Sequence, residues 1–200
     1  MNEALAFLQQ PHIAIPIVIV TVVAIFLSGR RWTALYVGLM PVINWAFAGI
    51  PTIPIAENLG GGDWHPFTIV TGLVLVVRDF AQREIKHWIL AAMLLGLALS
   101  TLTAWPVIVV ASGVAFLISE TADWAVFTFS DRPLSQRILI SSAISAPVDQ
   151  ALFLWLASQV VPGMFALGSV VTGIVSKLIG AYVVSRIVAA QERRNALQTA

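Results

Sequence analysis

The chain has 200 residues, of which 58% are hydrophobic and only 10% are charged. A soluble domain of this size carries about 25% charged residues, so the composition excludes an ordinary solvated surface. The formal net charge of +1 gives no electrostatic basis for a nucleic-acid partner, and the absence of cysteine excludes disulfides and thiolate metal sites. The composition predicts an all-α integral membrane protein with the lipid bilayer as a partner.

The N-terminal stretch MNEALAFLQQPH has no basic residue ahead of its first apolar run, which argues against a cleaved signal peptide. A helix needs about 20 mostly apolar residues, within a range of about 17–25, to cross the hydrocarbon core. Seven segments meet this requirement, and the fourth is the weakest because its apolar part is short. They are 12-28, 33-50, 66-82, 88-104, 107-129, 137-160 and 164-188. Residues 1-200 are therefore expected to form one compact transmembrane domain of about seven helices.

Lysine and arginine outside the spans predict the orientation, because they accumulate on the cytoplasmic side. They follow the first, third, fifth and seventh spans, whereas the other connections contain none. This alternation requires seven spans in the cytoplasmic membrane, with the N-terminus outside and the C-terminus cytoplasmic. The long outer connection 51-66 is rich in proline and glycine, and it is either a lid over an outer vestibule or a flexible connector.

Six ionisable residues lie well inside the predicted spans: Arg78, Asp79, Glu120, Asp123, Asp149 and Lys177. Each costs roughly 2.5–3.5 kcal/mol at a helix centre, so such residues normally face the bundle interior and mark a function. At a rise of about 1.5 Å per residue, all but Asp123 fall at one depth, which predicts that they converge on one cavity. Asp123 lies one turn nearer the cytoplasm.

These charges have two readings. They are either ion pairs that hold helices together, with Arg78 and Lys177 as counter-ions, or they form a ligand or ion site. Two cations neutralise only two of the four acids. The two remaining carboxyl groups then either hold protons or await a cation or a hydrogen-bond-donating ligand.

Three further residues are weaker candidates for ligand contact. Asn44 lies between Pro41 and Pro51, where its amide either binds a ligand or satisfies a kinked backbone. Trp124 and Phe153 are aromatic residues that could stack on a flat ligand, although core or interfacial placement is the common case for tryptophan.

The sequence lacks the motifs of the common enzyme classes. It has no HExxH, no GxSxG and no GxxxxGK[ST], and its histidines lie at span ends. No metal or other cofactor is expected. An intramembrane hydrolase with Glu120 and Asp123 as a carboxylate pair is an alternative. Transport is favoured, because inward-facing polar groups at one depth on several helices suit a midplane substrate site.

Three segments resemble the core of the vitamin uptake transporter family, whose best-understood members are queuosine precursor transporters. They are FTIVTGLVLVVRDFAQRE (67-84), ASGVAFLISETADWAVFTF (111-129) and SSAISAPVDQALFLWLA (141-157). The pattern comprises Phe67, Arg78, Asp79, Ala111, Ser112, Asp123, Phe127, Ser142, Asp149 and Phe153. The resemblance covers about 66-190. Relatives usually have six helices, so it implies a six-helix core with one helix added at the N-terminus.

The resemblance implies uptake of 7-cyano- or 7-aminomethyl-7-deazaguanine across the cytoplasmic membrane. The family is also distantly similar to the substrate-binding subunits of energy-coupling-factor vitamin importers, which is a second alternative. Those subunits dock an ATP-driven module through small residues, and Ala111 and Ala115 have a suitable spacing. Assembly into a homo-oligomer is left open.

The residues and the resemblance agree on one chemical point. A guanine-type edge presents an N–H and an amino group side by side, and one carboxylate accepts both. The expectation is that Glu120 or Asp149 accepts these donors while Trp124 or Phe153 stacks on the ring.

Overall fold

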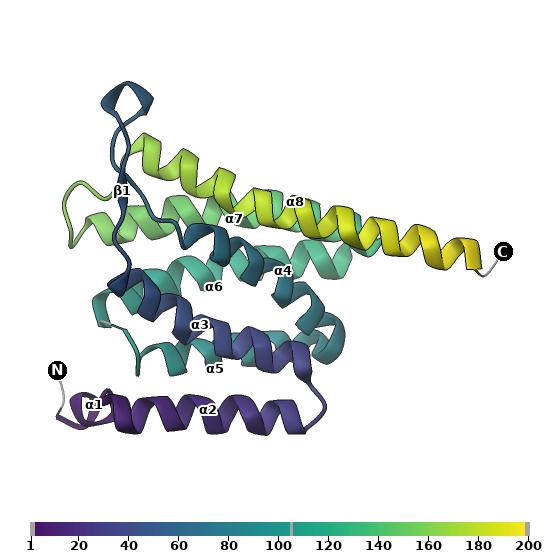
Figure 1. The fold of residues 1–200 in the computed structure, drawn as a ribbon, viewed down its shortest axis with the longest axis horizontal. Helices are drawn as coiled ribbons and strands as arrows, with labels where there is room; N and C mark the ends of the chain where they lie inside the picture. Colours follow the sequence, from purple (N-terminus) through teal and green to yellow (C-terminus); the bar gives the residue numbers. More distant parts are fainter. Residues whose placement is uncertain (1–2, 105, 199–200) are drawn as a thin grey trace.

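The computed structural model of the chain describes residues 3–104 and 106–198. Within these residues, seven helices have 12 or more residues (Figure 1). They are α2 (Pro11–Leu27), α3 (Arg31–Gly49), α4 (Thr68–Ile85), α5 (Ile89–Ser100), α6 (Pro106–Phe129), α7 (Leu134–Ser158) and α8 (Leu167–Gln198). A short helix, α1 (Glu3–Leu8), precedes them, and a 3₁₀ turn, η2 (Lys86–Trp88), joins α4 to α5. The predicted all-α bundle is confirmed.

Three helices contain segments long and apolar enough to cross a membrane by themselves: Val109–Phe129, Leu134–Ser158 and Leu167–Ala196. Pro11–Leu27 is a shorter apolar helix. Large hydrophobic side chains are also exposed on the outer faces, including Val20 on α2, Leu94 on α5 and Val110 on α6. Exposed apolar surface of this extent suits a bilayer and not water. The protein is a multi-pass membrane protein.

The observed helix ends differ most from the predicted spans at the ends of α5 and α8. α5 ends at Ser100, because the hydroxyl groups that follow bond to backbone carbonyls and favour turns: Thr101 Oγ1 donates to Ala98 O (2.7 Å) and Thr103 Oγ1 to Pro41 O (3.1 Å). With 12 residues α5 is only about 18 Å long. α8 continues past the predicted end at 188 to Gln198. Its last residues, QERRNALQ, are mostly polar, so hydropathy did not include them in the span although they are helical.

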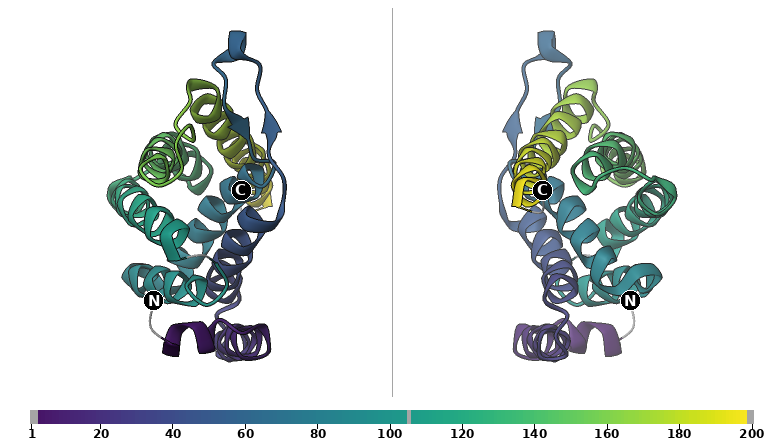
Figure 2. Two further views of the ribbon diagram at one scale, coloured as in Figure 1. Left: turned by 90° about the vertical axis from the view of Figure 1, so that its left-hand side faces the viewer. Right: turned by 90° about the vertical axis from the view of Figure 1, so that its right-hand side faces the viewer.

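The helices form a closed ring. α6 packs against α7, α7 against α8, α8 against α4, α4 against α3, α3 against α5, and α5 returns to α6. α2 lies outside the ring against α3 (Figure 2). A ring of six helices around a common centre gives the fold an interior on which side chains from all six can converge.

The connection 51-66 forms a β-hairpin that the sequence did not predict. β1 (Ile53–Pro54) pairs antiparallel with β2 (Asp63–Trp64), and a 3₁₀ turn, η1 (Glu57–Leu59), lies between them. Gly60 has a φ of 98°, and a Cβ there would lie 2.7 Å from the backbone N of Gly168, so only glycine fits this approach to α8. The hairpin is thereby held at the start of α8.

Candidate functional site

A cavity of about 240 Å³ lies inside the helix ring at the end covered by the hairpin. Its walls come from the hairpin and from α3, α4, α5, α6, α7 and α8. Four of the residues predicted as site or pairing residues line it: Asn44, Asp149, Phe153 and Lys177. The volume is below the roughly 300–1,000 Å³ of pockets for drug-sized ligands, so the cavity suits a smaller molecule.

Asp149 is the acidic group of this cavity that lies deepest among the helices. The Lys177 ammonium binds its Oδ2 at 2.6 Å, and the Ser119 hydroxyl donates to its Oδ1 at 3.3 Å. The Asp149 side chain keeps 15% of its surface exposed, whereas that of Lys177 keeps 4%. A carboxylate offers about four lone-pair positions, so two contacts leave Asp149 able to accept further hydrogen bonds.

Aromatic rings form one wall of the cavity. Phe47 stacks on His65 with ring centroids 4.1 Å apart and lies tilted against Phe153 at 6.2 Å. His65 is only 8% exposed, and its Nδ1 accepts a hydrogen bond from the backbone N–H of Phe67 at 3.1 Å. This contact places the ring proton on Nε2 of the neutral imidazole. Nε2 makes no hydrogen bond with any residue that the structure describes.

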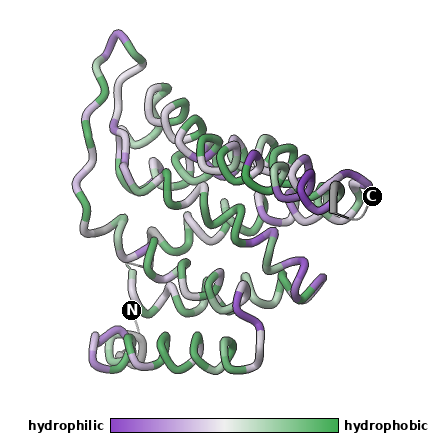
Figure 3. Tube along the Cα trace, turned by 45° about the vertical axis from the view of Figure 1, so that its right-hand side comes forward, coloured by the Kyte–Doolittle hydropathy of each residue, from purple (hydrophilic) through white to green (hydrophobic). Residues whose placement is uncertain are grey.

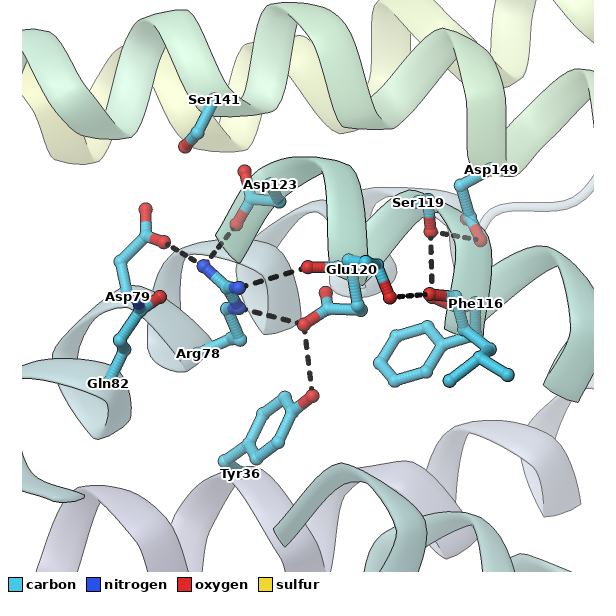
Figure 4. A network of polar contacts seen from close by, with 12 residues as sticks. Tyr36, Arg78, Asp79, Gln82, Phe116, Ser119, Glu120, Asp123, Ser141 and Asp149 are labelled. Carbon is cyan, nitrogen blue, oxygen red and sulfur yellow. Dashed lines mark hydrogen bonds and ion pairs between the residues drawn. The ribbon is translucent and has the colours of Figure 1, made fainter. Parts of the chain in front are cut away.

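A second polar group, the Arg78 cluster, consists of Arg78, Asp79, Glu120 and Asp123 (Figure 4). The guanidinium binds Asp79 through Nη1 at 3.1 Å and Glu120 Oε2 through Nε at 2.8 Å, and it also binds Asp123 through Nη1. Its Nη2 donates to the backbone carbonyl of Glu120 at 3.1 Å. The Tyr36 hydroxyl on α3 donates to Glu120 Oε2 at 3.1 Å. The cluster therefore joins α3, α4 and α6.

The Arg78 cluster is fully enclosed and rich in carboxyl groups. Arg78 and Asp79 are 0% exposed, and Glu120 and Asp123 are 1% exposed. One guanidinium meets three carboxyl groups, while the fourth intramembrane acid, Asp149, is paired with Lys177. Two carboxyl groups of the cluster thus have no cation of their own, as the sequence-based count of charges anticipated.

The prediction that the deep charges converge on one cavity is wrong for Arg78, Asp79 and Glu120. These residues do not line the cavity, because Arg78 draws the carboxyl groups of α4 and α6 into a separate buried cluster. Asp123 belongs to the same cluster. Of the two expected acceptors for a ligand edge, only Asp149 faces the cavity.

Trp124 and Asn44 have different surroundings. Trp124 lies away from the cavity, and its indole N–H donates to His87 Nδ1 at 3.3 Å. Among the aromatic candidates only Phe153 lines the cavity. The Asn44 amide lines the cavity and also donates to Met40 O at 3.1 Å, one turn earlier in α3.

Sequence reasoning missed most of the cavity residues, among them Phe47, His65 and Gln150. Gln150 is 4% exposed and donates to Ser169 O at 3.2 Å. A polar amide beside Asp149 in an apolar helix was a signal that could have revealed it. His65 carried no such signal, because its burial depends on how the hairpin folds back over the ring.

Comparison with known families gives one match. Residues 67–190 match the family described as "Putative vitamin uptake transporter", a stretch that covers α4 to α7 and most of α8. Comparisons with curated proteins and with solved structures gave no significant match. The matched stretch contains the Arg78 cluster, Asp149 and Lys177, and it exceeds half of the chain. The chain therefore belongs to the vitamin uptake transporter family and is a membrane transporter of vitamin-like substrates.

Proposed function

We propose that the chain imports a queuosine precursor, 7-cyano- or 7-aminomethyl-7-deazaguanine, and binds it in the cavity beneath the hairpin. The observation that carries the proposal is the pairing of a carboxylate acceptor with an aromatic wall in one small cavity: Asp149 with Phe47 and Phe153. A flat base with adjacent donors is the ligand class that this combination suits.

Asp149 is the acceptor for the donor edge of the base. The Lys177 ammonium is paired with the carboxyl group at 2.6 Å, and hydrogen bonds to a group in such a charged pair are stronger than those between neutral groups. The N–H and the 2-amino group of a guanine-type edge would bond to the lone pairs that Lys177 and Ser119 leave unused. Each such bond contributes about 1.5–3 kcal/mol.

The aromatic wall holds the ring system of the base. Phe47 and Phe153 line the same wall with ring centroids 6.2 Å apart, and stacking of a base on an aromatic side chain contributes about 1–3 kcal/mol. Neutral His65 places an N–H donor in the same wall, which suits the ring carbonyl of the base.

Two alternatives fit the structure less well. Ala111 is 6% exposed and Ala115 is 0% exposed, so this pair offers no surface on which an ATP-driven module could dock. Glu120 and Asp123 are both bound to Arg78 in an enclosed cluster, which leaves neither carboxyl group beside water for hydrolysis.

Uptake of labelled 7-deazaguanines by cells unable to make them tests the proposal. Asp149→Asn replaces one acceptor oxygen with a donor, and it should weaken binding by about 3 kcal/mol, at least about a hundredfold. The double variant Asp149→Asn with Lys177→Gln removes the ion pair as a whole. If the double variant regains affinity, Asp149 serves only to neutralise Lys177 and the proposed contact is wrong.

Two comparisons serve as controls, one between protein variants and one between ligands. Phe153→Leu should weaken binding while Trp124→Leu should not, because only Phe153 lines the cavity. Among ligands, purines without the 2-amino group should bind the unmodified protein weakly. Equal affinity for purines with and without that group would contradict the proposed substrate.

A further inference from the structure

The α6–α7 interface contains a polar seam that connects the cavity with the Arg78 cluster. On α6, Ser119 and Asp123 are four residues apart and share one helix face. On α7, Ser145 and Asp149 have the same spacing. The hydrogen bond from Ser119 to Asp149 sets the register of the antiparallel helices α6 and α7. Asp123 and Ser145 therefore lie opposite each other, one helical turn further from the cavity.

Buried polar atoms along this seam and in the adjoining Arg78 cluster have no hydrogen-bond partner among the described residues. Each carboxyl group of the cluster has at least one such oxygen: Asp79 Oδ2, Glu120 Oε1 and both oxygens of Asp123, of which Oδ2 is ion-paired with Arg78. The hydroxyl groups of Ser142 and Ser145 on α7 are also unpartnered, and these residues are 1% and 0% exposed. A row of unsatisfied hydroxyl and carboxyl oxygens can hold and pass protons, which an apolar interface cannot do.

The charge balance of the cluster shows how many protons it needs. The cluster itself contributes Arg78 and Asp79 from α4 and Glu120 and Asp123 from α6. The other ionisable or charged groups of this region are Tyr36 from α3, Asp149 from α7 and Lys177 from α8. Lys177 and Asp149 balance each other, and Tyr36 donates to Glu120 as a neutral hydroxyl. Arg78 then faces three carboxyl groups, so neutrality requires two protons or an equivalent cation.

A metal ion fits the cluster poorly. Among the described residues, no group of three or more acidic or histidine side chains is arranged to hold a metal ion. The guanidinium occupies the centre that a cation would need, as Figure 4 shows. Protons require no such central position, because each binds a single oxygen.

We propose that the Arg78 cluster is a proton-binding site that couples substrate uptake to proton entry, with the α6–α7 seam as the proton path to the cavity. This inference rests on the proposed function for its coupling step. A proton passes from water in the cavity to a carboxylate of the cluster, and the carboxyl group later releases it to water at the opposite end of the bundle. The proton gradient across the membrane supplies the driving force.

Infrared spectroscopy of the purified protein tests the proton site without any substrate. Protonated carboxyl groups have a C=O stretching band distinct from that of carboxylates. The band should be present at neutral pH, and it should fall by about half in Glu120→Gln or Asp123→Asn, because the remaining cluster needs one proton for neutrality. Glu57→Gln, at an exposed carboxylate of the hairpin, is the matched control and should leave the band unchanged. Absence of the band, or no change in either cluster variant, overturns the proposal.

Transport tests the coupling step. In phosphatidylcholine and phosphatidylglycerol vesicles that are more alkaline inside, the protein should accumulate labelled 7-cyano-7-deazaguanine, and a protonophore should abolish this. Glu120→Gln should still bind the probe but lose accumulation, since the amide mimics a permanently protonated acid. Equilibration without accumulation, or accumulation driven by a sodium gradient instead, overturns the coupling. If the unmodified protein neither binds nor moves the probe, the proposed substrate is wrong, and the infrared bands alone decide the proton site.

Discussion

Arg78 and Lys177 show how the chemistry of a single cation shapes its surroundings. The planar guanidinium of Arg78 presents five N–H donors and bonds to three carboxyl groups and one backbone carbonyl. The compact ammonium of Lys177 binds one carboxylate, Asp149. Arginine therefore forms a closed multi-helix cluster, whereas the lysine pair remains part of an open cavity wall. This difference separates the proposed proton site from the proposed substrate site.

His65 makes stability depend on pH. Burial lowers the pKa of His65 from its ordinary value of 6.5, and the nearby carbonyls of Ile50 and Phe47 oppose this only in part. The unfolded chain therefore binds a proton near pH 6.5 that the folded chain accepts only at lower pH. Because the unfolded state then holds more protons, the contribution to folding is full above pH 6.5 and is lost as the pH falls below it.

Thermal unfolding in detergent measures this effect. Between about pH 7.5 and about pH 5.5 the unfolding temperature of the unmodified protein should fall more steeply than that of His65→Gln, which keeps a polar side chain without the titration. If the unfolding temperature fell equally with pH in the two proteins, His65 would not be held neutral in the folded state.

The contact between α4 and α8 depends on one glycine. A Cβ at Gly72 would lie 2.5 Å from the carbonyl oxygen and 2.6 Å from the Cα of Lys177. Because both atoms belong to the backbone, α8 would have to move as a unit. Gly72→Ala should destabilise the protein by about 1–3 kcal/mol, the usual cost of overpacking, and weaken substrate binding by displacing Lys177.

Gly49→Ala is the matched control for this prediction. A Cβ at Gly49 would meet no atom within 4 Å, and the residue also lies in a helix. Alanine should be neutral there or slightly stabilising, since glycine disfavours helix by about 0.5–1 kcal/mol. Equal unfolding temperatures for the two variants in one detergent would refute the tight α4–α8 contact.

Hydropathy predicted the elements better than it predicted their contacts. Segment length and apolar content located α2 to α8, because burial in lipid leaves helix as the only way for a single segment to satisfy its backbone. The hairpin escaped prediction, since a strand such as β1 (Ile53–Pro54) has no periodicity to detect. Tertiary contacts decide such short elements.

The site was predictable only as a set of charges. Depth along each helix indicated that Arg78 and Glu120 are buried and that Asp149 lies away from the lipid, where it lines the cavity, because lipid excludes charge. Depth does not specify how each helix is rotated about its own axis. That rotation decides which acid contacts Arg78 and which contacts Lys177. That choice separated Asp149 from Glu120, and no sequence pattern encoded it.

At the scale of the whole molecule, the ring has one strongly basic end. The connections α2–α3, α4–α5 and α6–α7 lie at the same end as the last turns of α8 (Figure 1). Apart from Arg78 and Lys177, every lysine and arginine of the chain falls in or next to these segments. Figure 3 shows hydrophilic stretches gathered at this end of the helices. The hairpin and the cavity lie at the other end.

This asymmetry predicts the orientation of the protein. Basic residues near span ends remain in the cytoplasm, so the basic end should be cytoplasmic and the cavity should face outward, as an importer requires. An odd number of passes then puts the N-terminus outside. Met1 and Ala200 lie outside the described residues, and reporters fused to them test the prediction directly. A reporter active in the cytoplasm should work only after Ala200, and one active outside only before Met1. A cytoplasmic Met1 would reverse the cavity relative to the membrane and remove the basis for uptake through it.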